Sequence, residues 1–303
     1  MKTKISILLL ILAVFVAVVM SCQALMQVAD IGAQIAGATG AIDQNTANAV
    51  SISARAIGSA AEEITPEQEY YIGRAVAANI LSSYRIWNGN AALTAYLNKI
   101  CASITINSPR PDVYNGYHVA ILDNNEINAF ATSGGHIFVT RGLINAAKSE
   151  DALAGVIAHE IAHIQLQHSI KAIRNSRATQ ALLITGTSAA GAYAGMDVNQ
   201  LTDIFNETIG EIVTTLVNNG YSRDQEFEAD NTAMSLMASA GYSPSGLVDM
   251  LNELSRVQTS SSGLGRTHPT PAQRITNAGR SVGNYRVADT RSHRQARFTA
   301  ATR

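Results

Sequence analysis

Residues 152–164 read Ala-Leu-Ala-Gly-Val-Ile-Ala-His-Glu-Ile-Ala-His-Ile, an apolar run that contains the motif His-Glu-x-x-His. On a helix, residues four positions apart lie on one face about one turn apart, so the imidazoles of His159 and His163 can reach the same metal ion. Glu160 follows the first histidine, where a carboxylate can act as a base on a water molecule at the metal instead of binding the ion. A buried helix with two incidental histidines is the alternative interpretation of the motif alone.

A second group of polar residues lies downstream, in the stretch Tyr-Ser-Arg-Asp-Gln-Glu-Phe-Glu-Ala-Asp at 221–230. Glu226 and Asp230 are four positions apart and therefore share one face of a second predicted helix. A catalytic zinc ion typically takes three protein ligands and leaves a fourth position to water. We therefore predict that Glu226 is the third ligand, beside His159 and His163. Asp230 is expected to accept the free N–H of one metal-bound histidine, because such partners fix the tautomer and the ring orientation.

The chain resembles a known family from about residue 65 to residue 281. The resemblance rests on six stretches in the family's order and spacing, namely Tyr96–Ile100, Ile127–Ala131, Gly134–Leu143, Ser149–His163, Ser222–Asp230 and Thr267–Ile275. The family is that of the zinc metallopeptidases that include HtpX and the prenyl-CaaX proteases. Within it, the chain is most similar to the periplasmic lipoproteins of the BepA and LoiP type.

The resemblance implies one zinc ion per chain, held by His159, His163 and Glu226, with Glu160 as the general base. It also implies a mainly helical α+β fold, a zincin-like metallopeptidase domain with a small β-sheet whose edge strand lies beside the active-site helix.

A strand that begins at His136 resembles the substrate-binding edge strand of the family. Such an edge offers unpaired backbone groups to an extended peptide. Gly135, His136 and Ile137 are therefore candidates for contact with substrate, and the side chain of His136 is expected to line the cleft or to have a structural role.

Three further residues are candidates for assisting or regulating the reaction. Tyr221, Arg223 and His268 are possible partners of the scissile carbonyl in the transition state. His268 lies in the Pro-rich segment 267–271, after the Ser- and Gly-rich run 259–265. We hypothesise that its imidazole occupies or shields the open metal position until substrate displaces the loop. The alternatives for His268 are a local structural role and a role in the transition state.

Two other residues near the motifs are expected to lie away from the metal. His168 follows His163 by five positions, about 140° around a regular helix, so it cannot share the metal and is interpreted as structural. Glu228 follows Glu226 by two positions, about 200° around the helix, and is expected to point away.

The first residues of the chain resemble an export signal. Met1–Lys4 is basic, and Ile5–Met20 is an uncharged apolar run that is short for a membrane span and typical of a secretory signal. Val19-Met-Ser-Cys22 resembles a bacterial lipoprotein cleavage box, which predicts a signal peptide over 1–21 and lipidation of Cys22. An ordinary signal peptide or an uncleaved anchor is the alternative. The residue after the cysteine is not Asp, which resembles outer-membrane sorting, so we expect an exported cell-envelope lipoprotein in the outer membrane that faces the periplasm.

Composition divides the rest of the chain into three parts. Residues 22–64 are rich in Ala, Gly, Ser, Gln and Asn, which predicts a flexible tether or a loosely helical segment. Residues 65–283 carry the motifs and are expected to form the metallopeptidase domain, in which 178–217 would wall the cleft. Residues 284–303 carry five Arg against one Asp and lack apolar periodicity, which predicts a disordered basic tail.

Apolar spacing and cap residues also predict the main elements of the domain. Two short strands are expected at 117–122 and 136–140. Helices are expected at 67–83, 91–103, 150–175 with Ser149 as N-cap, 222–240, 245–255 and 271–278.

The sequence therefore predicts a zinc-dependent endopeptidase of the bacterial cell envelope that hydrolyses peptide bonds in unfolded or misassembled proteins. The alternative is an envelope assembly factor or chaperone that keeps the zinc site and rarely cuts its clients. Either protein would have protein or peptide partners and would contact the membrane through a lipid on Cys22. The formal net charge of −1 gives no indication of a nucleic-acid partner.

Overall fold

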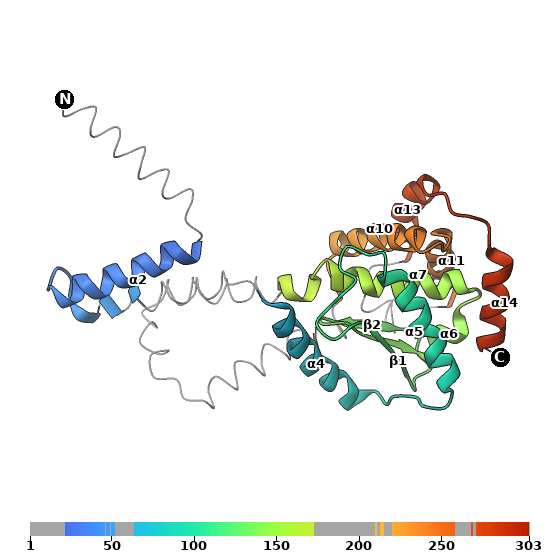
Figure 1. The fold of residues 1–303 in the computed structure, drawn as a ribbon, viewed down its shortest axis with the longest axis horizontal. Helices are drawn as coiled ribbons and strands as arrows, with labels where there is room; N and C mark the ends of the chain where they lie inside the picture. The colour runs from blue at the N-terminus through green and yellow to red at the C-terminus, as the bar shows by residue number, and fades with distance from the viewer. Residues whose placement is uncertain are drawn as a thin grey trace, which may run out of the picture. The chain divides into compact units, whose positions relative to one another are not determined.

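The structure is a computed structural model that describes residues 22–45, 47–48, 50–51, 64–172, 210, 213–214, 220–257, 268 and 271–302. The chain divides into two compact units, Met1–Ile64 with Lys171–Asn206, and Thr65–Ile170 with Glu207–Arg303. In the first unit, helix α2 spans Cys22–Ala38 (Figure 1). The predicted signal peptide and nearly all of 178–217 lie outside the described residues. None of the described helices is long and apolar enough to cross a membrane.

The second unit contains a three-stranded sheet of β1 (His118–Leu122), β2 (Ala129–Thr132) and β3 (His136–Thr140) in the order β1-β3-β2. The central strand, β3, runs parallel to β1 and antiparallel to β2. The prediction that Gly135, His136 and Ile137 belong to an edge strand is therefore wrong. A tight turn joins β2 to β3. It contains Gly134 and Gly135, whose φ values of 80° and 99° are favourable for glycine. Sequence periodicity missed β2 because it has four residues, all of them buried.

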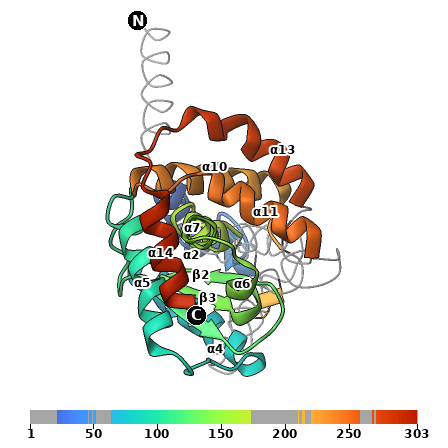
Figure 2. The same ribbon diagram turned by 90° about the vertical axis from the view of Figure 1, so that its right-hand side faces the viewer.

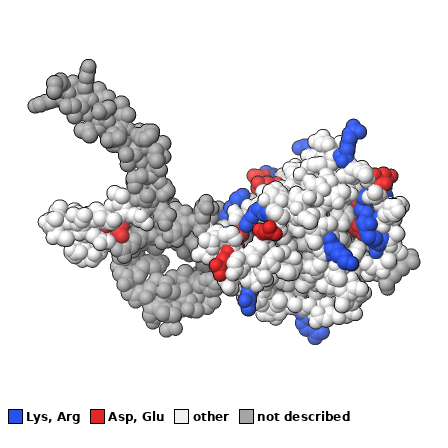
Figure 3. Space-filling model, in the orientation of Figure 1, with Lys and Arg blue, Asp and Glu red and all other residues white. Residues whose placement is uncertain are grey.

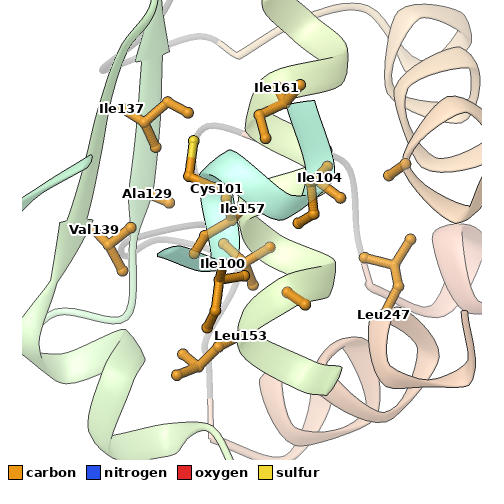
Figure 4. Close-up of a cluster of buried hydrophobic side chains, with 14 of the residues drawn as sticks. Ile100, Cys101, Ile104, Ala129, Ile137, Val139, Leu153, Ile157, Ile161 and Leu247 are labelled. Atoms are coloured by element: carbon orange, nitrogen blue, oxygen red, sulfur yellow. The ribbon is translucent and has the colours of Figure 1, made fainter. Parts of the chain in front are cut away.

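One face of the sheet packs against α5 (Ala91–Thr105) and α7 (Glu150–Gln165), and this interface forms the core (Figure 4). Side chains alternate along a strand, so every second residue points to this face. These residues are Val119, Ile121, Ala129, Ala131, Ile137 and Val139. Ile137 is thus a core side chain instead of a substrate contact. Helix α4 (Pro66–Ser83) contacts β2 and β3, and Tyr84 beyond its end meets Phe130, which points to the other face, at 5.5 Å between ring centroids.

On its other side, α7 packs against α10 (Arg223–Ser239) and α11 (Ser245–Val257), which in turn contact α13 (Pro271–Ser281). Figure 2 shows α7 nearly end-on, between the sheet and these three helices. A Cβ at Gly155 would lie 2.8 Å from the Leu247 Cα, so glycine permits α7 and α11 to approach closely. The short helix α6 (Arg141–Ala146) leads from β3 towards α7, and a 3-10 turn, η3 (Val282–Asn284), follows α13. Helix α7 is consequently the buried centre of the unit.

The last segment of the chain is not a disordered tail, because Arg291–Thr302 forms helix α14, which packs against α5 and α7. The Arg294 Nε lies 2.8 Å from the Asp151 Oδ1 in a buried ion pair, and Arg297 binds the carboxylate of Glu150. Both acidic residues lie in the first turn of α7, where they complement the helix dipole and are themselves buried. Two of the five arginines that suggested a disordered tail therefore neutralise buried carboxylates, and Phe298 gives the helix its buried apolar contact.

We predict that Phe298→Ala lowers the free energy of unfolding by about 3 kcal/mol, since a buried aromatic side chain is removed from the α14 contact. Urea unfolding followed by far-ultraviolet circular dichroism measures this value. His293→Ala, on the exposed side of the same helix, is the matched control and should change stability by less than about 0.5 kcal/mol. Identical unfolding midpoints for Phe298→Ala and the wild type would contradict the docking of α14.

Candidate metal centre

His159 and His163 lie one turn apart in the C-terminal half of α7. The helix is started by Ser149, whose hydroxyl accepts a hydrogen bond from the Ala152 backbone N–H at 3.1 Å. From this start, 3.6-residue periodicity places the two imidazoles on one face, and their Nε2 atoms are 3.0 Å apart. Both side chains are buried. The structure thus brings the two histidines together as the motif predicts.

Glu226 reaches the same point from the first turn of α10. The N-cap residue Ser222 and Gln225 form a reciprocal capping box, which fixes where this helix begins. The Glu226 Oε2 lies 3.4 Å from the His159 Nε2, and the Glu226 Oε1 lies 3.5 Å from the His163 Nε2. The predicted third ligand is therefore in contact distance of both histidines.

The spacing of these donor atoms fits a tetrahedral zinc ion. Zinc binds nitrogen and carboxylate oxygen at about 2.0–2.2 Å, so neighbouring ligands at tetrahedral vertices are about 3.3 Å apart. The three separations, 3.0, 3.4 and 3.5 Å, bracket this value. Within the described residues, the buried Glu226 Oε1 has no hydrogen-bond partner, which leaves it available to a metal ion. His159, His163, Glu226 and His268 are also the single group of potential metal ligands that the described part of the chain assembles.

Asp230 and Arg274 support the His159 side of the centre. The Asp230 Oδ1 lies 3.0 Å from the His159 Nδ1, as expected for a residue that accepts the N–H of a metal ligand. Arg274 of α13 donates two hydrogen bonds to the same carboxylate, from Nε to Oδ2 at 2.9 Å and from Nη2 to Oδ1 at 2.6 Å. Its Nη1 lies 3.6 Å from the Glu226 Oε2. Sequence reasoning missed Arg274, although it belongs to the 267–275 stretch of the resemblance, because nothing local indicates that its partner lies on another helix.

The electrostatics of the site favour a cation between these side chains. Burial alone raises the pKa of Glu226, but the neighbouring histidines, His268 most of all, outweigh burial and hold the pKa well below its ordinary value. Burial lowers the pKa of His159, as does Arg274, but hydrogen bonds to Asp230 and Glu226 prevail and raise the pKa to about 9. Carboxylates that stabilise a proton on this imidazole also attract a cation bound to it.

Glu160 lies on α7 next to the ligand cluster, in surroundings that suit a base. Burial raises the pKa of Glu160 above its ordinary value, and the charge of His159 opposes this effect. A raised pKa brings a carboxylate closer to the pH at which it accepts and releases protons efficiently. The Glu160 Oε1 is buried without a hydrogen-bond partner in the described residues. With Val156 and Leu247, Glu160 lines a small apolar cavity between α7 and α11.

Of the other predicted site residues, Tyr221 and His268 lie at the metal centre, whereas Arg223 and His136 lie away from it. The Tyr221 ring stacks on the His163 ring with 4.3 Å between centroids, and the His268 Nδ1 lies 2.7 Å from the Glu226 Oε2. Arg223 is not brought to the centre, because its exposed side chain lies near Asp224 and lines a cavity between α10 and α13. His136 contacts the Thr132 hydroxyl at 3.3 Å and stacks on Tyr70, so it lies with α4 residues.

His168 lies outside the group of potential metal ligands, as predicted, but it contacts one of them. Its Nδ1 lies 2.8 Å from the His163 Nδ1, so it contacts a predicted metal ligand directly. The angular argument assumed a regular helix to residue 175, but α7 ends at Gln165 and Gln167 has a φ of 54°. Glu228 is half-exposed and away from the ligand cluster as predicted, and its Oε2 lies 3.3 Å from the His168 Nε2.

The chain is similar to several known metalloproteases. It is 31% identical over 150 residues to metalloprotease LoiP of Escherichia coli (strain K12), which covers 49% of this chain and 56% of that protein. It is 26% identical over 229 residues to the beta-barrel assembly-enhancing protease of the same organism, with 73% and 45% covered. It is 31% identical over 129 residues to metalloprotease YcaL of that organism, with 43% and 47% covered. The chain spans about half the length of these relatives.

A family model gives the broader assignment. The model of peptidase family M48 matches residues 90–281, which include α5, the sheet, α7, α10, α11 and α13. Every predicted ligand, Glu160 and Arg274 lie within the matched range. The chain belongs to peptidase family M48.

Proposed function

We propose that this chain is a zinc-dependent endopeptidase that hydrolyses peptide bonds in unfolded or misassembled proteins of the bacterial cell envelope. The observation that carries the proposal is the convergence of His159, His163 and Glu226 at tetrahedral spacing, with Glu160 beside them. Membership of a peptidase family and the metalloprotease names of three relatives support it.

The mechanism follows from the roles of the residues around the ligands. A bound zinc ion supplies Lewis-acid chemistry, since it polarises a carbonyl and lowers the pKa of water to about 7. Glu160 accepts a proton from the attacking water and delivers it to the leaving amine, so that the peptide bond breaks to a carboxylate and an amine. Asp230, held by Arg274, orients the His159 ring, and Tyr221 packs against His163 and limits its rotation.

The face drawn in Figure 3 shows how charged side chains are distributed. Acidic and basic side chains are interspersed on the face in Figure 3, and much of that face carries neither. An assembly factor that binds clients and cuts rarely is the second candidate, because an imidazole at the metal centre, such as that of His268 beside Glu226, would limit turnover.

We expect the wild-type protein to bind one zinc ion and to cleave unfolded casein. His159→Ala, His163→Ala and Glu226→Ala should lose the metal, because each removes one of three ligands. Glu160→Gln should keep zinc but lose cleavage, since the amide cannot accept the proton. Elemental analysis of the dialysed proteins and release of casein fragments measure the two properties. Full zinc affinity in Glu226→Ala would rule out this ligand, and cleavage by Glu160→Gln would rule out this base.

His268 is proposed to shield the metal centre in the resting enzyme. Its ring lies 5.3 Å from the His159 ring, and its Nδ1 contacts Glu226. Removal of the imidazole should open the centre, so His268→Ala is expected to raise the peptidase activity towards casein in initial-rate assays. A large fall in kcat would instead indicate a role in the transition state, and an unchanged rate would indicate a local structural role.

A lipid anchor on Cys22 and an outer-membrane location facing the periplasm are further parts of the proposal. They rest on the apolar run before Val19-Met-Ser-Cys22, and they suit a peptidase that meets envelope proteins. Metabolic labelling with a palmitate analogue should mark the wild type and not Cys22→Ser. Equal labelling of the two proteins would exclude this anchor.

A further inference from the structure

We propose that His168 is a positioning residue for the metal ligand His163 and that Glu228 in turn orients His168. This inference rests on the proposed zinc site. The contacts form one line, in which the His163 Nδ1 lies 2.8 Å from the His168 Nδ1 and the His168 Nε2 lies 3.3 Å from the Glu228 Oε2. His168 is fully buried, so its ring is held where this line requires it.

The positions of the protons follow from the contacts. The Nε2 of His163 faces His159 and Glu226, so Nε2 would be the atom that holds a metal ion, and the proton of the neutral ring would then be on Nδ1. A contact between two ring nitrogens contains one hydrogen, so the Nδ1 of His168 must accept. A neutral imidazole that accepts through Nδ1 carries its proton on Nε2. That proton faces the carboxylate of Glu228, so every donor in the line meets an acceptor.

The backbone is shaped to bring His168 into this line. Gln167 has a φ of 54°, in the left-handed region that residues other than glycine rarely adopt, and this breaks α7 and turns His168 back. The side chain of Gln167 donates a hydrogen bond to the buried Glu69 of α4. Arg110 binds the same carboxylate at 2.7 Å and donates to the Ile164 carbonyl at 3.2 Å. Two side chains thus anchor an unfavourable turn whose result is the contact between the histidines.

The two histidine ligands are therefore supported by different groups. His159 is supported by a carboxylate, Asp230, which is paired with Arg274. His163 is supported by a neutral imidazole, and the carboxylate that ends its line, Glu228, is half-exposed. Charge explains the difference. A second buried carboxylate would be uncompensated, whereas an imidazole provides the acceptor without adding charge.

Zinc affinity of two His168 variants tests the inference. His168→Leu fills the buried site with an apolar side chain but removes the acceptor. It should weaken zinc binding about 10–100-fold, as loss of such a partner usually does. His168→Asn places the amide oxygen on Cγ, where the Nδ1 is attached, and should keep zinc affinity close to that of the wild type. Competition with a chromogenic chelator measures affinity without peptidase activity, and Asp230→Ala is the comparison on the His159 side.

The possible outcomes separate positioning from packing. Thermal unfolding of the metal-free proteins shows whether each variant folds. Wild-type zinc affinity in a folded His168→Leu would overturn the inference and leave the proposed function intact, whereas absence of zinc binding by the wild type would overturn both. Nitrogen-15 spectra of the zinc-loaded wild type give an independent test that needs no variant. The proton of His168 should lie on Nε2, and a proton on Nδ1 would overturn the inference.

Discussion

The burial of α7 is the constraint on which the rest of the second unit depends. The helix is enclosed by the sheet on one side and by α10 and α11 on the other, yet it carries Glu150, Asp151, His159, Glu160 and His163. A buried polar or charged group is costly unless a partner satisfies it. The neighbouring helices therefore had to supply partners as well as apolar surface. Arginines of α14 meet the acidic first turn, and side chains of α10 and α13 meet the histidines.

The composition of the metal centre reflects the same constraint. Glu160, Glu226 and Asp230 place three carboxylates within one buried region, and Arg274 provides one positive charge. A divalent cation bound to neutral imidazoles would bring these formal charges to zero. The buried region around the ligands is therefore matched to a divalent ion in charge, and the ligands are matched to zinc in spacing.

Local patterns in the sequence were sufficient to predict the features that depend on residue spacing within one helix and on helix caps. The convergence of His159, His163 and Glu226 could be predicted because the two histidines, and likewise Glu226 and Asp230, are four residues apart on one helix. Ser149 and Ser222 marked the helix starts. The features that were not predicted depend on contacts between distant segments or on the backbone conformation of a single residue. Arg274 and the arginines of α14 bind carboxylates on helices that are distant in the sequence. The contact of His168 with His163 depends on the left-handed backbone of Gln167. The central position of β3 depends on the order of the strands in the sheet. None of these relations appears in the periodicity of a single segment.

The contact of α14 with α7 also sets an order of assembly. Glu150 and Arg297, which form an ion pair, are 147 positions apart, and all residues of the metal centre lie between them in the sequence. Contacts that close so long a loop require most of the chain to be present, and they tend to form late in folding. A nascent chain thus contains both histidines before it can neutralise the acidic end of their helix. Completion of the helix that carries both histidines is thereby linked to synthesis of α14.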